Sequence, residues 1–247
     1  MTLTKEQIDI YRTQGHLTVP AVFSGSEMDS ATADAMVWAE EFQAGLSAEE
    51  RAWYLERATA GGPIVRKLDN PVFHRPAFRR LAESQRLAAM VAQLIGPGLR
   101  VVFSQIFFKP PEVGGPKPMH QDNFYFGCDD RDGMVTAWIA LDAATVENGC
   151  LHFGDGSNRG PVFPHVAPPD KPFDLQLAEE EAARHTMTPA PVPRGGVSFH
   201  HGNTLHQSSA NRSKAWRRAA AFHYVNAQTQ FATPALSYDS DVVVFVG

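Results

Sequence analysis

The chain has 247 residues, 43% of them hydrophobic, and a formal net charge of −5 from 22 basic and 27 acidic side chains. This length and apolar content favour a single domain over residues 1–247 with a sizeable core, and no polar tract suggests a disordered chain. The acidic balance argues against nucleic acid and anionic membranes as partners, because both attract basic surfaces.

The missing targeting signals and the few cysteines indicate the cellular compartment of the protein. No apolar run approaches the roughly 20 residues that span a bilayer. Residues 1–6 lack the basic and apolar blocks of a signal peptide. Cys128 and Cys150 are too few for a disulfide scaffold, although one incidental disulfide stays open. We expect a cytoplasmic protein, and the sequence leaves its oligomeric state open.

Helical patterns dominate the first part of the chain, about 1–98. Thr4 is suited to cap a helix that runs to about Gln14, where Gly15 stops it. A short strand is expected over 16–19. Further helices are predicted over 26–44, 48–59 and 77–95, the last with a break near Ser84.

From about residue 99 the pattern changes to short β runs between Gly and Pro turns. The predicted strands lie over 101–108, 134–141, 151–153, 197–199, 219–225 and 242–246. They do not alternate with helices, which favours a sandwich or barrel over a parallel α/β sheet. The Pro-rich, acidic stretch 161–193 predicts a lid-like insert over the barrel mouth, with a short helix at 176–184.

His120-Gln121-Asp122 is the first candidate for a metal site. Residues i and i+2 of an extended strand point to the same face, so His120 and Asp122 can reach one ion while Gln121 points away. Two imidazoles and one carboxylate suit Fe(II) and leave coordination positions open. The motif alone is weak in a chain with ten histidines, and a surface or capping pair is the alternative.

The third ligand candidate is His206 or His201, and spacing by itself does not choose between them. The arginines that follow favour His206. Arg217 follows His206 and could lie on a neighbouring strand, where a guanidinium would bind a dicarboxylate co-substrate. The alternative for Arg217 is a solvated or salt-bridged strand residue.

Together these motifs resemble the phytanoyl-CoA dioxygenase (PhyH) family of Fe(II)/2-oxoglutarate oxygenases. The matching pieces are Lys109-Pro110-Pro111, His120-Gln121-Asp122, Trp138-Ile139-Ala140-Leu141-Asp142, Glu147-Asn148-Gly149-Cys150-Leu151, Asn211-Arg212-Ser213 and Arg217-Arg218-Ala219. Gly156-Ser157-Asn158 departs from the usual G-S-H. The resemblance implies a mainly β fold with flanking helices, whose double-stranded β-helix (jelly-roll, cupin-like) core spans about 99–247.

Carried over residue by residue, the resemblance implies Fe(II) ligation by His120, Asp122 and His206. It also implies 2-oxoglutarate binding by Arg217, with Ser208 as a hydroxyl donor. Two further contacts to the co-substrate are implied, by Trp138 and, across a one-residue alignment gap, by Lys67. A lone lysine is otherwise usually solvated.

The substrate pocket is the least determined part. Strand alternation places Phe103, Gln105 and Phe107 on one face, which points into the barrel in the family. Gln105 would then bind 2-oxoglutarate or substrate; alternatively it faces water. Phe124, Tyr125 and Phe126 form either a substrate wall or packing under a loop.

The implied reaction uses O₂ and releases succinate and CO₂ while a C–H bond of a small-molecule substrate, a metabolite or natural-product intermediate, is hydroxylated. The same cofactors could instead give desaturation, epimerisation or cyclisation. Asp122 argues against a halogenase, because related halogenases carry a small residue at the matching position. A cupin-like metal-binding module without turnover is the rival from another class, and Arg217 weighs against it.

Overall fold

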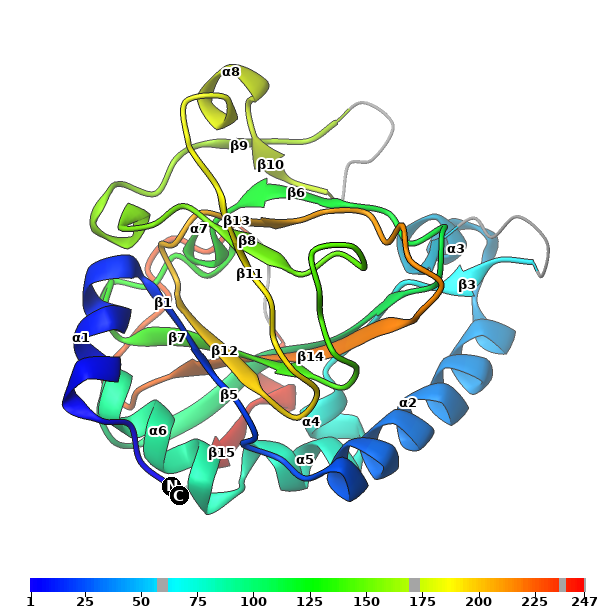
Figure 1. The fold of residues 1–247 in the computed structure, drawn as a ribbon, viewed down its shortest axis with the longest axis horizontal. Helices are drawn as coiled ribbons and strands as arrows, with labels where there is room; N and C mark the ends of the chain where they lie inside the picture. Colours follow the sequence, from blue (N-terminus) through cyan, green and yellow to red (C-terminus); the bar gives the residue numbers. More distant parts are fainter. Residues whose placement is uncertain (57–61, 169–173, 236–238, 247) are drawn as a thin grey trace.

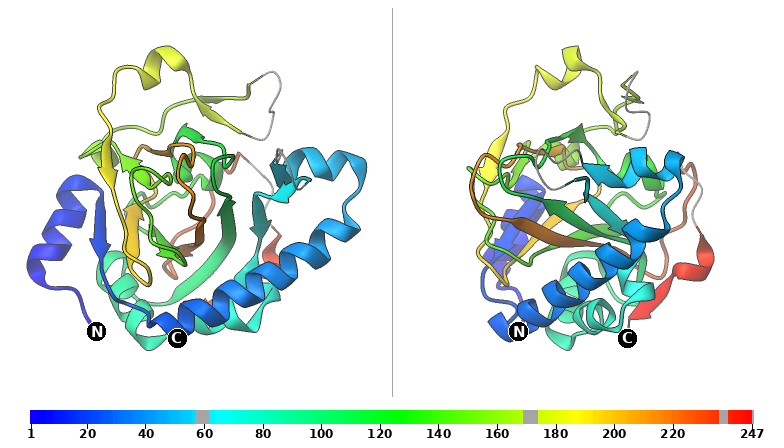
Figure 2. Two further views of the ribbon diagram at one scale, coloured as in Figure 1. Left: turned by 45° about the vertical axis from the view of Figure 1, so that its right-hand side comes forward. Right: turned by 90° about the vertical axis from the view of Figure 1, so that its right-hand side faces the viewer.

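The structure, a computed structural model, describes residues 1–56, 62–168, 174–235 and 239–246. Two antiparallel sheets form its centre, and helices lie against the outer side of the larger sheet (Figure 1). The long helix α2 (Gly25–Gly45) and the shorter α5 (Pro76–Ala82) and α6 (Gln85–Ile95) underlie this sheet in both views of Figure 2. This arrangement leaves the space between the two sheets for a site.

The N-terminal helix α1 (Lys5–Gln14) begins and ends where the sequence predicts. The Thr4 side chain accepts a hydrogen bond from the backbone N–H of Gln7, and Gly15 ends the helix with φ 82°. A glycine adopts this left-handed conformation without steric cost. The predicted strand β1 (His16–Val19) follows directly and pairs at the edge of the larger sheet.

Two helix predictions need correction. The helix predicted over 48–59 is shorter, because after α3 (Ala48–Tyr54) the backbone of β2 (Leu55–Glu56) pairs with β3 (Ile64–Val65). Residues 57–59 lie outside the described residues. The helix predicted over 77–95 is the pair α5 and α6, with the expected break at Ser84. Between β3 and α5 lie β4 (Lys67–Asp69) and α4 (Pro71–His74), which the sequence did not predict.

Most strands belong to two large sheets, and every pairing of described strands is antiparallel. The larger sheet has the order β1, β12 (Val197–His201), β7 (Met134–Ala140), β14 (Arg217–Val225), β5 (Leu99–Lys109), β15 (Val244–Val246), with β4 also paired to β5. The smaller sheet has the order β11 (Thr188–Ala190), β8 (Leu151–Phe153), β13 (His206–Ser208), β6 (Lys117–His120). The predicted mainly β, jelly-roll-like architecture is confirmed.

Successive side chains of β14 point alternately into the hydrophobic core and towards the space between the two sheets. Phe222 belongs to the main core between the larger sheet and the helices, whereas Ala221 packs in a second cluster between the two sheets. Because residues two apart on a strand share a face, Arg217 and His223 point the same way as Ala221. Both side chains line a cavity between the sheets.

The stretch 161–193 stands on the side away from the helices (Figure 1). It contains a two-stranded sheet of β9 (His165–Val166) and β10 (Gln176–Leu177), and α8 spans only Glu179–Ala182. The helix predicted at 176–184 is therefore shorter, because its first residues pair with β9 instead. Within the described residues there are also two short 3₁₀ turns, η1 (Ser157–Arg159) and η2 (Ser240–Val242), the second before β15.

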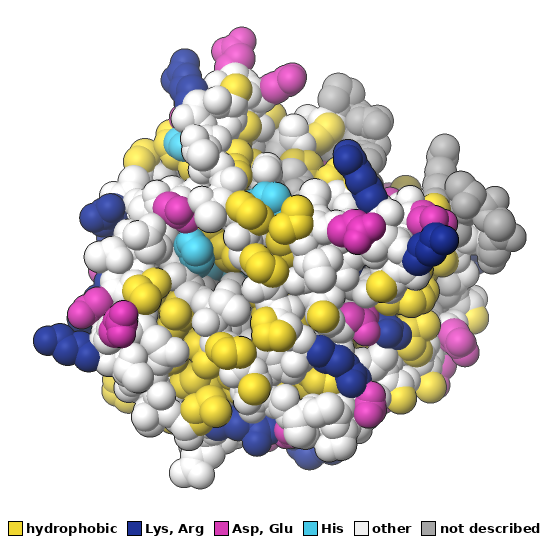
Figure 3. Space-filling model, viewed as in Figure 1, with side chains coloured by type: hydrophobic (Ala, Val, Ile, Leu, Met, Phe, Trp, Pro, Cys, Tyr) yellow, Lys and Arg dark blue, Asp and Glu magenta, His cyan; other side chains and the backbone are white. Residues whose placement is uncertain are grey.

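The surface is mixed in charge. On the face seen in Figure 3, lysine and arginine side chains are interspersed with aspartate and glutamate. Both cysteines are free thiols. Within the described part of the chain, no helix is both long and apolar enough to cross a membrane.

Candidate functional site

The three predicted metal-binding side chains meet between the sheets. His120 ends β6 and pairs directly with His206, the first residue of β13. Asp122 opens the short helix α7 (Asp122–Phe126), so it does not continue the strand as the i, i+2 pattern assumed. The pattern still holds locally, because Gln121 between them is extended, with φ −127° and ψ 131°. One ligand atom from each of the three lies within 4.8 Å of the others.

The carboxylate of Asp122 is held by neighbours that leave one oxygen free. Its Oδ2 accepts a hydrogen bond from the Thr136 hydroxyl at 2.6 Å and lies 3.0 Å from His200 Nε2. Its Oδ1 lies 3.8 Å from His120 Nε2 and 3.6 Å from His206 Nε2. Oδ1 is therefore the atom that faces the position of an ion.

The charge of this carboxylate is fixed by its surroundings. Burial alone would raise the pKa of Asp122, but His206, His223 and His200 hold that pKa well below its usual range. The carboxylate is therefore ionised, which suits an anionic ligand for a metal ion.

The two histidines present their lone pairs to the same point. The Nδ1 atom of His120 lies 2.8 Å from the Pro118 carbonyl, and that of His206 lies 3.0 Å from the Thr204 carbonyl. A carbonyl only accepts, so both Nδ1 atoms carry the proton and both Nε2 atoms are free to bind a metal. Burial lowers the pKa of His120 well below its ordinary value, which keeps the ring neutral.

His201, the alternative third ligand, is turned away from this point. Its Nε2 lies 3.0 Å from the exposed carboxylate of Asp132, and its Nδ1 accepts from the backbone N–H of Asn203. Both ring nitrogens of His201 are therefore used elsewhere, and the structure favours His206.

Gln121 points away from the ion position and is fully buried. Its side-chain amide donates to the carbonyls of Pro161 and Asn203, at 3.0 and 2.8 Å, and its side-chain oxygen accepts from the Phe163 N–H at 2.8 Å. Its backbone N–H donates to His165 Nε2 at 3.0 Å. Residues 161–165 therefore fix the loop that carries two of the candidate metal-binding residues.

Arg217, the predicted anchor of the co-substrate, is 3% exposed and lines the same cavity as the three metal-binding side chains. Its Nε has no hydrogen-bond partner, and none of the ion pairs of the described residues includes it. Its guanidinium lies over the ring of Trp138, 5.6 Å from the ring centre. A buried, unpartnered guanidinium is costly unless an anion binds it.

The neighbouring Arg218, unlike Arg217, has an acidic partner. It faces away and forms a bidentate pair with Asp142, at 2.7 and 2.9 Å. The alternative of a salt-bridged strand residue thus applies to Arg218 and not to Arg217.

Ser208 lies at the Arg217 end of the cavity and is joined by a residue that the sequence reasoning missed as a site residue. The buried Lys109 donates from Nζ to Ser208 Oγ at 2.8 Å and to the carbonyl of Ser209. In the sequence, Lys109 stands out only as the first residue of a Lys-Pro-Pro motif. Its position opposite Arg217 on the neighbouring strand is a tertiary relationship that the motif does not reveal.

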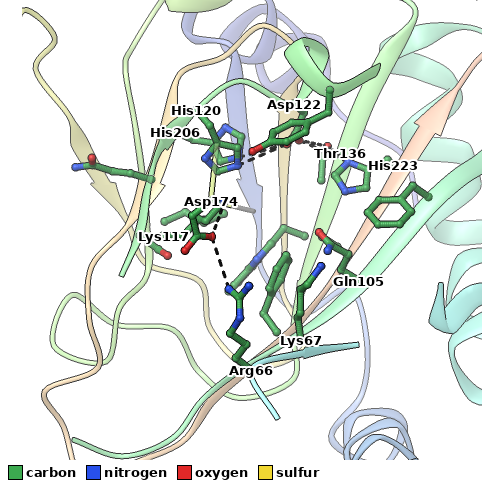
Figure 4. A pocket seen from close by; sticks show the side chains of 18 of the residues that line it. Arg66, Lys67, Gln105, Lys117, His120, Asp122, Thr136, Asp174, His206 and His223 are labelled. Carbon is green, nitrogen blue, oxygen red and sulfur yellow. Dashed lines mark hydrogen bonds and ion pairs between the residues drawn. The ribbon is translucent and has the colours of Figure 1, made fainter. Parts of the chain in front are cut away.

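The cavity has a volume of about 370 Å³, and Figure 4 shows its lining. Phe103, Gln105 and Phe107 of β5 all line it, so Gln105 does not face outside water. The Gln105 amide donates to Asp69 Oδ1 at 2.7 Å, and Lys67 Nζ donates to Asp69 Oδ2 at 3.1 Å. Asp69 thus joins Lys67 and Gln105, which both line the cavity, into one hydrogen-bonded group.

The three aromatic residues after Asp122 do not all line the cavity, as they would in the predicted substrate wall. Tyr125 and Phe126 line the cavity, whereas Phe124 does not and stacks on the His165 ring at 4.0 Å. In a helix, residues i, i+3 and i+4 share a face. Because Asp122 opens α7, Tyr125 and Phe126 follow it to the cavity and Phe124 turns outward.

Charged residues stand at the mouth of the cavity. Asp174, from the stretch 161–193, lies 3.2 Å from Lys117 and 3.6 Å from Arg66 (Figure 4). The cavity is therefore aromatic along β5 and α7 and charged where it meets this stretch.

Comparisons with known proteins agree with this geometry. The family model described as phytanoyl-CoA dioxygenase (PhyH) matches residues 11–219, so the chain belongs to the PhyH family. The resemblance stated from the sequence is confirmed.

Phytanoyl-CoA dioxygenase domain-containing protein 1 of Rattus norvegicus is 36% identical over 161 residues, which cover 62% of this chain and 54% of the relative. The chain thus spans about half the length of that relative. A probable alpha-ketoglutarate-dependent hypophosphite dioxygenase of Stutzerimonas stutzeri is 28% identical over 229 residues, 90% of this chain and 78% of the relative. Among solved structures, the alpha-ketoglutarate-dependent carbocyclase SnoK from nogalamycin biosynthesis superposes with a TM-score of 0.78 at 24% identity, over 99% of this chain and 97% of that one. This last likeness confirms the fold.

Proposed function

We propose that the protein is a non-heme iron dioxygenase that uses Fe(II), 2-oxoglutarate and O₂ to oxidise a small molecule. The observation that carries this proposal is the buried, unpartnered Arg217 in the same cavity as the His120, Asp122 and His206 donor set. A site for a cation and a site for an anion then lie side by side. The name of the Stutzerimonas relative supports the same co-substrate.

The residues present fit both groups. His120, Asp122 and His206 would hold the iron with two neutral imidazoles and one carboxylate, which leaves coordination positions open. Arg217 and Ser208 would hold the distal carboxylate of 2-oxoglutarate, with Trp138 beside the guanidinium. When bound, the pair supplies O₂ activation coupled to release of succinate and CO₂.

The chain's own contribution is to orient and to exclude water. Thr136 and His200 fix the Asp122 carboxylate, and the stretch 161–193 fixes the loop at Gln121. Phe103, Phe107 and Phe126 would form the apolar wall that positions substrate, with Tyr125 in place of Phe124. A dry, shaped cavity favours reaction at the positioned carbon over side reactions.

We propose hydroxylation of a C–H bond as the outcome. The Asp122 carboxylate in the donor set supports this against halogenation, because related halogenases carry a small residue at the matching position. The fold also serves a carbocyclase, so cyclisation, epimerisation and desaturation are the outcomes that product analysis separates from hydroxylation. Aromatic walls with charged residues at the mouth favour a partly apolar metabolite that carries a polar group.

Lys67 and Gln105 would contact the co-substrate or substrate from the wall opposite the metal-binding residues, held in place by Asp69. The chain would form a single domain over residues 1–247. The stretch 161–193 would cover the cavity, which the contacts of Asp174 with Arg66 and Lys117 support.

The test is consumption of 2-oxoglutarate with Fe(II) under air, measured as succinate released. The wild type should form succinate slowly without substrate and faster with it. Asp122→Ala should form none, and Asp132→Ala, which alters an exposed carboxylate, should behave as the wild type. Equal succinate formation by the wild type and Asp122→Ala would refute the proposal.

A further inference from the structure

Two buried cations face each other at one end of the cavity. Lys109 on β5 pairs directly with Arg217 on β14, and both side chains are buried and line the cavity. Like charges directly opposite on neighbouring strands destabilise a sheet. None of the ion pairs found within the described ranges includes either residue. If both side chains were charged, two cations would therefore lie side by side without an acidic partner from the described residues.

The hydrogen bonds of Lys109 indicate how this repulsion is avoided. Its Nζ donates to Ser208 Oγ at 2.8 Å and to the carbonyl of Ser209. A neutral amine has two N–H bonds, and these two acceptors use both of them, whereas an ammonium has a third. Because Ser208 accepts from Lys109, its own hydroxyl proton is free to be donated to a ligand.

The groups that face Lys109 come from several elements. Burial, and after it the neighbouring Arg217, lower the pKa of Lys109 to about 6, although Glu56 of β2 and the Cys150 thiol oppose the shift. His152 of β8 is a further neighbour, and its own pKa is lowered first by burial and then by Lys109. The balance of these surroundings favours a neutral amine near neutral pH.

We propose that Lys109 is a proton-coupled part of the co-substrate site: its amine is neutral without an anion and takes up one proton as the distal carboxylate of a dicarboxylate binds beside Arg217. The proton comes from solvent, and the amine becomes an ammonium whose third N–H bonds the carboxylate. The inference rests on the proposed function, because 2-oxoglutarate supplies the carboxylate. Lys109 is then a binding residue that also makes co-substrate affinity depend on pH.

The direction of this dependence follows from linkage. Binding that takes up a proton weakens as pH rises, and the dissociation constant of 2-oxoglutarate should rise about tenfold per pH unit wherever the free amine is neutral and the bound one is charged. That window begins above the pKa of about 6 for the free amine.

The experiment is isothermal titration of 2-oxoglutarate into the Mn(II)-loaded protein. Titrations in HEPES and in Tris at one pH separate proton uptake from binding, because the two buffers release protons with different enthalpies. At pH 7.5 the wild type should take up about one proton. Lys109→Met should bind more weakly, take up none and show no pH dependence. The matched surface variant Lys214→Met should behave as the wild type.

The possible results decide separate questions. Binding by the wild type without proton uptake overturns the inference and leaves the proposed function intact, as does unchanged uptake in Lys109→Met. Failure of the wild type to bind 2-oxoglutarate overturns the proposed function and the inference together. If Lys109→Met does not fold, the pH dependence of 2-oxoglutarate binding to the wild type tests the inference. A dissociation constant that rises about tenfold per pH unit between about pH 7 and 8.5 supports it, and a constant that does not change with pH overturns it.

Discussion

The Thr136 hydroxyl donates to Asp122 Oδ2 at 2.6 Å, and this bond determines which carboxylate oxygen faces the ion. The same hydroxyl lies 2.9 Å from His223 Nδ1. Since its one proton goes to the carboxylate, the hydroxyl must accept from His223. His223, Thr136 and Asp122 thus form a chain of hydrogen bonds that ends at the proposed metal.

Thr136→Val should weaken metal binding while the fold is kept, because valine has the shape of threonine without the hydroxyl. Loss of a group that orients a metal ligand costs about 10- to 100-fold in affinity. Titration of Mn(II) into the protein measures it. Thr18→Val, on β1 and away from the cavity, is the control. Equal affinities of the two variants would show that the Thr136 contact does not orient Asp122.

His206→Ala should reduce Mn(II) affinity by more than about 100-fold, the upper range for orienting residues, because a ligand itself is lost. His201→Ala should change it little, since both ring nitrogens of His201 are bonded elsewhere. Circular dichroism checks that both variants fold. The opposite ranking in the metal titration would assign the third ligand to His201.

Arg217→Gln should weaken 2-oxoglutarate binding far more than metal binding. A charge-assisted pair lost from a buried site costs about 2–5 kcal/mol, or about 30-fold and upward in affinity. Arg218→Gln breaks a partly exposed pair with Asp142, worth about 1 kcal/mol or less, and should leave 2-oxoglutarate affinity unchanged. The two variants are compared by titration of 2-oxoglutarate into the Mn(II)-loaded protein. A larger loss in Arg218→Gln would contradict the strand register.

Acid should destabilise the contact between His165 and the metal-binding loop. Burial lowers the pKa of His165 from 6.5 to about 4. The unfolded chain then binds a proton that the folded chain does not, so stability is lost as pH falls from about 6.5 towards about 4. Protonated Nε2 also cannot accept from the Gln121 N–H. Urea unfolding of His165→Gln should show a flatter pH profile than the wild type over this window. Parallel profiles would exclude His165 as the cause.

Local patterns predicted the elements that depend on local structure. The Thr4 cap, the Gly15 stop and the alternation along β5 follow from nearest neighbours in the chain, and the structure has each of them. The i, i+2 relationship of His120 and Asp122 also held, because it required only an extended residue between them.

The errors arose where tertiary contacts override the local pattern. The helix predicted over 48–59 ended early because Leu55 and Glu56 pair with a strand some ten residues later. Phe124 was assigned to the substrate wall by sequence proximity, and the short helix α7 turned it outward. Strand alternation does not predict such a change from strand to helix within one motif.

The residues around the ligands were missed for a related reason. Thr136, His200 and Lys109 reach the site from three different strands. Their role depends on which strands lie side by side, and β7, β12 and β5 are far apart in the chain. The motifs and the family resemblance therefore predicted the three candidate ligands that the structure brings together, and only the sheet order revealed their neighbours.

The most direct test of the central claim is an anaerobic titration of 2-oxoglutarate into the Fe(II)-loaded protein, followed by visible absorption. Chelation of Fe(II) by the keto-acid end of 2-oxoglutarate produces a charge-transfer band. We expect this band in the wild type, saturating at one equivalent. It should shift to much higher 2-oxoglutarate concentrations in Arg217→Gln and be absent in Asp122→Ala. No band in the wild type, or the same band in all three proteins, would contradict the assignment of this cavity as an iron and 2-oxoglutarate site.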